Sequence, residues 1–264
     1  MVRGNPEQIH HQTFHHQVAF PAMSAALARV SLFAIATTLQ TVSVVPPNPV
    51  PDEAHQERFR KLAGPSTSQG SDPSRIRGGS GPDEWTKRKQ KLRSQLGPFY
   101  FPYAFAIFFW ILVILEVPRS FDHENPLNCR FVLGTLLTAL ASALRFSSFR
   151  SLGHHFTYQL AILPSHTLIT TGPYAYVRHP SYVAPPFIIS GCALSFTSQG
   201  TVLRERIGPS TDTVVLGVLV GMLYVGWQFV KRAEVEDRVL KEEFGKEWEE
   251  WARVVKYRFI PGLY

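Results

Sequence analysis

Residues 99–117, FYFPYAFAIFFWILVILEV, decide the fold of this chain. The stretch is apolar and aromatic throughout and carries a single charged side chain, Glu116. About twenty apolar residues in a helix are long enough to cross the hydrocarbon core of a bilayer. The sequence therefore predicts a transmembrane helix here.

Further apolar runs lie on both sides of this stretch, separated by polar segments. We expect spans at 18–45, 130–146, 183–197 and 213–230. The run 183–197 is short and contains Pro185 and Pro186, which favours a kinked helix that bends back or a buried half-hairpin. The predicted fold is all-α: a multi-spanning membrane protein of about five transmembrane helices, with a cytosolic cofactor-binding loop and a C-terminal helix.

Small residues within these runs predict close contacts between helices. Gly134 lies in the 130–146 run, and Gly217 and Gly221 form a small-xxx-small pair in the 213–230 run.

The chain divides by composition into four parts. They are a polar tail at 1–17, a first transmembrane helix at 18–45, a disordered basic loop at 46–98 and a membrane domain at 99–264. His11 and His15 of the tail would share a helix face, but no carboxylate or cysteine completes a ligand set. We therefore expect a tail and no metal site.

The net charge of +7 comes from basic residues that flank the apolar runs. This distribution favours an anionic lipid surface and disfavours nucleic acid as a partner. The two cysteines, Cys129 and Cys192, form no Cys-x-x-Cys pair and indicate no disulfide framework.

Five spans fix a testable topology. The loops 46–98 and 147–182 and the tail 231–264 then share one side of the membrane, and they carry most of the Lys and Arg residues. The positive-inside rule predicts that this side is cytosolic.

Two polar stretches on that side hold the residue types of a reactive site. The first, HTLITTGPYAYVRHPSY at 166–182, has turn signals at Gly172-Pro173 and His179-Pro180. The second, VKRAEVEDRVLKEEFGKEWEEWARV at 230–254, places Arg232 and Glu236 on one helix face. Taken separately, the two stretches suit an interfacial tyrosine belt and a solvated helix face.

An apolar stripe follows in the second stretch at helical spacing. It consists of Leu240, Phe244, Trp248 and Trp251. We expect it to pack against the membrane surface or the 147–182 loop.

Together, the order of these motifs is specific. His-Pro-Ser-Tyr, a short apolar segment, Arg-x-Glu-x-Glu, Phe-Gly-x-x-Trp-x-x-Trp and Arg258-Phe259-Ile260-Pro261 succeed one another. In this order the chain resembles the isoprenylcysteine carboxyl methyltransferase family of membrane enzymes from about Leu152 to Pro261. One departure is visible: the Gly that usually follows the Ser-Tyr-x stretch is Ala184 here, followed by Pro185-Pro186.

The resemblance implies an S-adenosylmethionine-dependent enzyme that methylates the C-terminal carboxylate of prenylated cysteine in CaaX-processed proteins. It also implies a multi-pass protein of the endoplasmic reticulum membrane, with its catalytic face and C-terminus in the cytosol. Its partners would be C-terminally prenylated proteins and the lipid bilayer. Carried over to this sequence, Arg232 would be the catalytic and substrate-binding residue, and the S-adenosylmethionine site would comprise Gln159, His166, Thr167, Leu168, Ile169, Tyr174, His179, Pro180, Ser181, Tyr182 and Glu236.

These residue types suit such chemistry. A carboxylate acceptor is already ionised near neutral pH, so the enzyme must mainly align the two reactants. Arg232 offers planar paired donors for that carboxylate. Glu236 can accept from amino or hydroxyl groups of the cofactor, and Tyr174 and Tyr182 can pack on its adenine or sulfonium. The chain lacks the glycine-rich Rossmann fingerprint of many soluble nucleotide-binding proteins.

Two alternatives remain open. The first is a membrane methyltransferase acting on a phospholipid amine or a small isoprenoid, motivated by the Ala184-Pro185-Pro186 departure. The second is a non-catalytic membrane scaffold, motivated by the 46–98 loop. Methyl-donor binding separates the scaffold from both enzymes.

Overall fold

The structure is a computed structural model that describes residues 6–45, 48, 51, 53–63, 84–122, 127–157 and 167–263. Within these ranges the regular structure is helical throughout and contains no strand. This confirms the predicted all-α fold.

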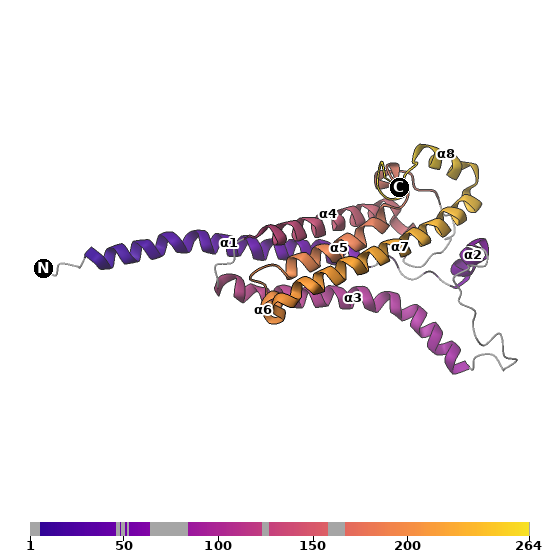
Figure 1. The fold of residues 1–264 in the computed structure, drawn as a ribbon. Coiled ribbons are helices and arrows are strands. Elements are labelled where there is room, and N and C mark those ends of the chain that lie inside the picture. Colours follow the sequence, from indigo (N-terminus) through magenta and orange to yellow (C-terminus); the bar gives the residue numbers. More distant parts are fainter. Residues whose placement is uncertain are drawn as a thin grey trace.

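Five long helices run alongside one another and form the body of the molecule (Figure 1). They are α1 (Pro6–Val44), α3 (Glu84–Asp122), α4 (Cys129–Leu152), α5 (Pro180–Phe196) and α7 (Thr211–Phe244). Four segments of the described chain are long and apolar enough to cross a membrane: Met23–Val44, Pro102–Phe121, Cys129–His155 and Val202–Phe244. The multi-spanning membrane fold is therefore confirmed.

The fifth predicted span is α5, a continuous helix of 17 residues. The expectation of a segment that bends back on itself is wrong, because α5 continues through Pro185 and Pro186 and ends at Phe196. It lies along α4, its principal neighbour in the described chain. Pro180 occupies the first turn, where a helix needs no backbone N–H from its residues.

Two glycines bring α4 and α5 into close contact. A Cβ atom added to Gly134 would lie 2.6 Å from Ser195 N and 2.7 Å from Gly191 O. A Cβ added to Gly191 would lie 2.8 Å from Thr138 N. The prediction of close packing at Gly134 is thus confirmed.

The second small-residue face behaves differently. Around Gly217 and Gly221 of α7, an added Cβ would meet no described atom within 4 Å. The expected helix contact at this pair is absent from the described part of the chain, and the apolar side chains beside it, including Leu216 and Leu223, are exposed. This face suits contact with lipid.

An aromatic cluster fills the centre of the bundle. Phe33 of α1 packs with Phe131 and Phe196 at ring-centroid distances of 4.8 and 4.6 Å, and Phe109 of α3 lies 5.2 Å from Phe196. All four rings are buried. The four helices α1, α3, α4 and α5 therefore share one core.

Part of the range 46–98, predicted to be a disordered loop, is helical in the structure. It contains α2 (Glu53–Ala63), and α3 already begins at Glu84. α2 is held because Phe59 is buried against Val239 of α7. The composition of 46–98 does not reveal such a contact between distant segments, so α2 could not be predicted from it.

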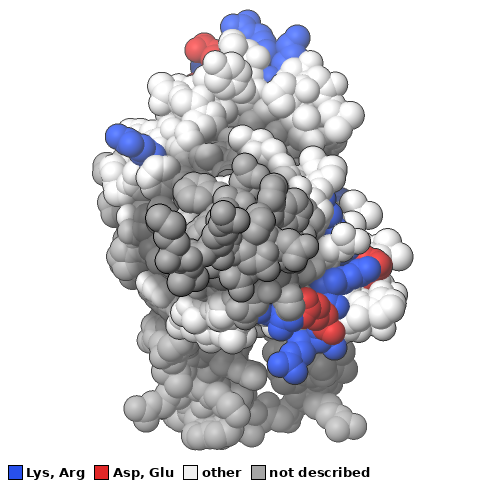
Figure 2. All heavy atoms as spheres, turned by 90° about the vertical axis from the view of Figure 1, so that its left-hand side faces the viewer, with Lys and Arg blue, Asp and Glu red and all other residues white. Residues whose placement is uncertain are grey.

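The two ends of the bundle differ in chemistry. The end that bears α6 (Val202–Ile207) lies opposite the end that bears α2, α8 (Lys246–Val254) and the C-terminus (Figure 1). Figure 2 faces the first of these ends and shows a mixed group of acidic and basic side chains at the lower right, with further charged side chains at the top and the left. The ion pairs there join Arg119 to Glu205, and both Arg130 and Arg204 to Asp212.

Candidate active site

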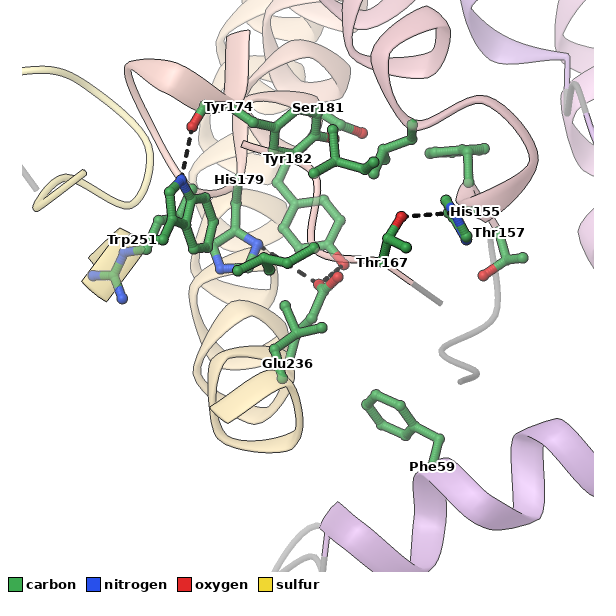
Figure 3. Close-up of a pocket in the computed structure, with 16 residues that line it drawn as sticks. Phe59, His155, Thr157, Thr167, Tyr174, His179, Ser181, Tyr182, Glu236 and Trp251 are labelled. Atoms are coloured by element: carbon green, nitrogen blue, oxygen red, sulfur yellow. Dashed lines mark hydrogen bonds and ion pairs between the residues drawn. The ribbon is translucent and has the colours of Figure 1, made fainter. Parts of the chain in front are cut away.

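A pocket opens at the end of the bundle that carries α2 and α8 (Figure 3). Its walls come from the end of α4 and the residues 153–157 that follow it, from the segment 167–182, from α7 beyond the apolar run, from α8 and from α2. The lining residues are Phe59, Leu152, His155, Phe156, Thr157, Thr167, Leu168, Ile169, Tyr174, Arg178, His179, Ser181, Tyr182, Glu236, Leu240 and Trp251. The two polar stretches identified in the sequence therefore meet in one place.

Local sequence chemistry shapes the first wall. Gly172 has φ +62°, a conformation that side-chain-bearing residues rarely adopt, and it is the first residue of the 3₁₀ turn η3 (Gly172–Ala175). His179 is non-helical because Pro180 follows it, and α5 begins at that proline. These two turns direct Tyr174, His179 and Tyr182 toward the same pocket.

A single buried carboxylate, Asp237, holds this wall to α7. Its Oδ1 lies 2.8 Å from His179 Nε2, and its Oδ2 accepts hydrogen bonds from Arg178 Nη1 at 3.0 Å and Arg258 Nε at 2.9 Å. Only 5% of Asp237 is exposed. The charge is thus compensated by two arginines at once, as a buried carboxylate requires.

Backbone hydrogen bonds extend the same junction. Arg178 N donates to Tyr257 O at 3.0 Å, and His179 N donates to Arg258 O at 2.7 Å. The C-terminal segment is therefore fixed against the residues that precede α5, and His179 is held through both its backbone and its ring.

A second chain of contacts links Tyr182, Glu236 and Arg232. The Tyr182 hydroxyl donates to Glu236 Oε2 at 2.5 Å and accepts from Arg232 Nε at 2.9 Å. The expected pairing of Arg232 with Glu236 on one helix face thus includes the Tyr182 hydroxyl between them. His179 Nδ1 lies 3.7 Å from the same Glu236 oxygen, so Glu236 faces the pocket from between two rings.

Tyr174 and Trp251 close the side of the pocket near α8. Burial and the nearby Glu236 carboxylate raise the pKa of the Tyr174 phenol well above its usual value, so this group stays protonated at neutral pH. Trp251 Nε1 donates to Tyr174 O at 3.3 Å (Figure 3). The pocket thus combines a neutral phenol with the carboxylate of Glu236.

The predicted apolar stripe is divided between two helices. α7 ends at Phe244, Gly245 has φ +55°, and α8 begins at Lys246. The resulting change of direction brings Trp251 to the pocket and places the Arg178 guanidinium 5.7 Å from the Trp248 ring centroid. The stripe therefore packs against the loop that precedes α5.

Most of the site residues expected from the sequence come together. Those that line the pocket are Thr167, Leu168, Ile169, Tyr174, His179, Ser181, Tyr182 and Glu236. Pro180 is buried at the start of α5, and Arg232 reaches the site through Tyr182. Gln159 and His166 lie outside the described residues.

Asp237, Phe59 and His155 were not predicted as site residues from the sequence. Asp237 adjoins Glu236 and lies four residues after Ala233, which is fully buried, so helical spacing places it on the inner face. Phe59 and His155 come from segments with no distinctive motif. His155 Nε2 lies 3.3 Å from Thr167 Oγ1.

The described residues contain no group of three or more His, Cys, Asp or Glu side chains suited to a metal ion. The chemistry of the pocket itself is organic: aromatic rings, a carboxylate, a guanidinium and apolar side chains. Such a set fits the methyl donor named above, whose adenine requires apolar or aromatic walls and whose amino and hydroxyl groups require acceptors.

One family of known proteins resembles part of this chain. The model of the Isoprenylcysteine carboxyl methyltransferase (ICMT) family matches residues 132–202, and this confirms the resemblance predicted from the motifs. The matched segment includes η3 and α5 and ends before Arg232 and Glu236. It supports a membrane methyltransferase.

A curated relative gives a second, partial likeness. Delta(14)-sterol reductase ERG24B of Gibberella zeae is 27% identical over 116 residues, which cover 37% of this chain and 24% of the relative. The match thus spans about a quarter of the relative's length. No solved structure matches the chain significantly.

Proposed function

We propose that this membrane methyltransferase uses S-adenosylmethionine to methylate the C-terminal carboxylate of prenylated cysteine. The observation that carries the proposal is the Arg232–Tyr182–Glu236 chain at the pocket, with hydrogen bonds of 2.9 and 2.5 Å. It joins a cation suited to a carboxylate acceptor with a carboxylate suited to the donor's polar groups.

The donor site would consist of the pocket-lining residues expected from the sequence. Glu236 would accept from the donor's amino or hydroxyl groups, while Tyr174 and Trp251 would pack against its flat ring. When bound, the donor supplies an electrophilic methyl group. Gln159 and His166 belong to the same proposal, since the family resemblance assigns them to this site.

Arg232 would orient the acceptor. A guanidinium presents planar paired donors that suit a carboxylate, and the Nε of Arg232 donates to the Tyr182 hydroxyl at the pocket. The acceptor is ionised at neutral pH, so alignment of the two reactants and exclusion of water would account for catalysis. The apolar spans next to the site would accept the prenyl tail from the bilayer.

Localisation follows from the same proposal. A protein that acts on prenylated CaaX products would reside in the endoplasmic reticulum membrane, with the pocket on the cytosolic side. The concentration of Lys and Arg in the segments at the pocket end supports this orientation.

The test is transfer of labelled methyl from S-adenosylmethionine by the full chain in lipid vesicles. Farnesyl- and geranylgeranyl-cysteine are offered beside phosphatidylethanolamine and a small isoprenoid. We expect methylation of the prenylcysteines and a loss of about 100-fold in Arg232→Ala, the scale of removing one preorganised electrostatic contact. Lys231→Ala is the matched control, because Lys231 is exposed and pairs with Glu234.

Unchanged activity in Arg232→Ala would remove that residue from the mechanism. Methylation of the amine or the isoprenoid with none of prenylcysteine would favour the lipid-directed alternative. Failure to bind the donor at all would favour the scaffold.

A second candidate function comes from the likeness to the Gibberella zeae reductase, whose name describes action on a sterol. This chain would then reduce a sterol double bond at the same pocket and consume a hydride donor. Sterol reduction coupled to oxidation of a nicotinamide cofactor, without methyl transfer, would establish this function in place of the first.

A further inference from the structure

Two consecutive prolines in the second turn of α5 leave two backbone carbonyls beside the pocket without their helical N–H donors. In an α-helix each N–H bonds the carbonyl four residues earlier, and proline has no N–H. Pro185 therefore withholds a donor from the Ser181 carbonyl, and Pro186 withholds one from the Tyr182 carbonyl. Ser181 and Tyr182 both line the pocket.

An arginine from the neighbouring helix bonds the first of these carbonyls. Arg145 Nη1 of α4 donates to Ser181 O at 2.8 Å and lies 3.2 Å from Ser181 Oγ. Only 6% of Arg145 is exposed, and its guanidinium carbon lies 4.8 Å from the Phe149 ring centroid. This geometry lets a buried guanidinium stand in for the N–H that Pro185 lacks.

The same side chain also reaches the end of α1. Arg145 Nε donates to Ser43 O at 2.9 Å, in the last turn of a helix that ends at Val44. Carbonyls in a last turn have no helical donor. One arginine thus joins α1 and α4 to the first turn of α5.

We propose that Arg145 is a positioning residue for the active site. It holds the first turn of α5 so that the Tyr182 hydroxyl meets Glu236 and Arg232. Arg145 does not itself line the pocket. The inference rests on the proposed methyl transfer where activity is measured. Where amide exchange is measured, it rests on the geometry alone.

The chain offers a matched rescue experiment. Arg145→Met removes the donors and leaves Ser181 O unsatisfied. In the double variant Arg145→Met/Pro185→Ala, the new alanine N–H supplies a helical donor to that same carbonyl. Arg145→Met/Pro186→Ala makes the same chemical change one residue later, but its N–H reaches Tyr182 O instead. Arg150→Met, an exposed arginine of the same helix, is the control for loss of charge.

We measure kcat/KM for prenylcysteine methylation and hydrogen–deuterium exchange of the amides at 181–184 in the full chain in vesicles. Arg145→Met should lower kcat/KM by about 10-fold to 100-fold and speed exchange, the scale of an unsatisfied buried acceptor. Adding Pro185→Ala to Arg145→Met should raise kcat/KM about 10-fold and return amide exchange to its slow wild-type rate. Pro186→Ala should restore neither, and Arg150→Met should behave as the wild type.

Equal rescue by the two proline variants would overturn the proposal, because it would show a general gain in helix stability. Wild-type activity and exchange in Arg145→Met would also overturn it. If Arg145→Met alone fails to fold, the two double variants are compared with each other, and only Arg145→Met/Pro185→Ala should recover folding and activity. If the wild type transfers no methyl group, the proposed function fails, and the exchange pattern still decides whether Arg145 holds this turn.

Discussion

At the residue scale, Asp237 is the group on which the junction of the two site stretches depends. It is the shared partner of Arg178, His179 and Arg258. Asp237→Asn keeps the shape of the side chain but removes its negative charge. The positive charges of Arg178 and Arg258 then lose the carboxylate that compensates them. We expect a loss of about 3 kcal/mol of unfolding free energy, typical of a broken buried ion pair, and a parallel loss of methyl transfer. Thermal unfolding of the purified protein measures the first effect.

Glu234→Gln is the control for this change. Glu234 lies on the same helix, is substantially exposed and pairs with Lys231 at 3.3 Å. Exposed ion pairs contribute about 0–1 kcal/mol, so this variant should unfold close to the wild-type temperature. Equal effects of the two substitutions would contradict the central role of Asp237.

The difference between these acids also shows how far single residues could be predicted. Glu236 was expected at the site because it belongs to a recognisable Arg-x-Glu-x-Glu spacing. Asp237 was missed because its burial depends on the segment around Arg258 folding back onto α7. Nothing in the local pattern reports that contact.

At the element scale, the contact of α4 with α5 depends on two positions without side chains. Gly134→Ala would put a Cβ 2.6 Å from Ser195 N, a backbone atom that cannot move alone. The helices must separate, at a cost of about 1–3 kcal/mol. Gly217→Ala meets no described atom within 4 Å and gains helix propensity, so it should be neutral or slightly stabilising. The midpoints of unfolding in detergent compare the two, and a similar shift in both would contradict this packing.

The helix α2 makes a separate contribution to the site. Phe59 is 6% exposed, packs on Val239 and also lines the pocket (Figure 3). Phe59→Ala removes an aromatic wall, and we expect the dissociation constant of S-adenosylhomocysteine to rise about 10-fold, equivalent to about 1.4 kcal/mol. Calorimetric titration measures this change.

Leu62→Ala separates the two roles of α2. Leu62 belongs to the same apolar contact with α7 but does not line the pocket. Its substitution should affect affinity less than that of Phe59. Unchanged affinity in Phe59→Ala would show that α2 contributes nothing to the donor site.

These helices also show why element boundaries were harder to predict than elements. Hydropathy located the apolar cores of α1, α3, α4 and α7, because the bilayer requires a minimum apolar length. It did not reveal that α3 starts at Glu84 or that α7 continues to Phe244. Outside the apolar zone, helix ends depend on tertiary contacts and on single residues such as Gly245.

At the scale of the whole molecule, the parallel arrangement of the spans separates two chemically distinct ends. The pocket, α2 and α8 lie at one end, and the Arg119–Glu205 and Arg130–Asp212 pairs lie at the other (Figures 1 and 2). The sequence predicted this separation from loop charge and the number of spans. The two ends are separated in the structure as well, because the continuous helix α5 carries the chain from the pocket end to the opposite end.

The two ends provide a direct test of orientation. Cys129 is exposed at the start of α4, at the end opposite the pocket, while Cys192 is buried. If the pocket faces the cytosol, a membrane-impermeant maleimide should label Cys129 in sealed vesicles with the cytosolic face outward only after the vesicles are permeabilised. In the variant Cys129→Ser/Lys246→Cys, the new thiol lies on the exposed start of α8 and should be labelled in intact vesicles. Labelling of Cys129 without permeabilisation, together with protection of position 246, would reverse the proposed orientation and exclude a cytosolic prenylated protein as the acceptor.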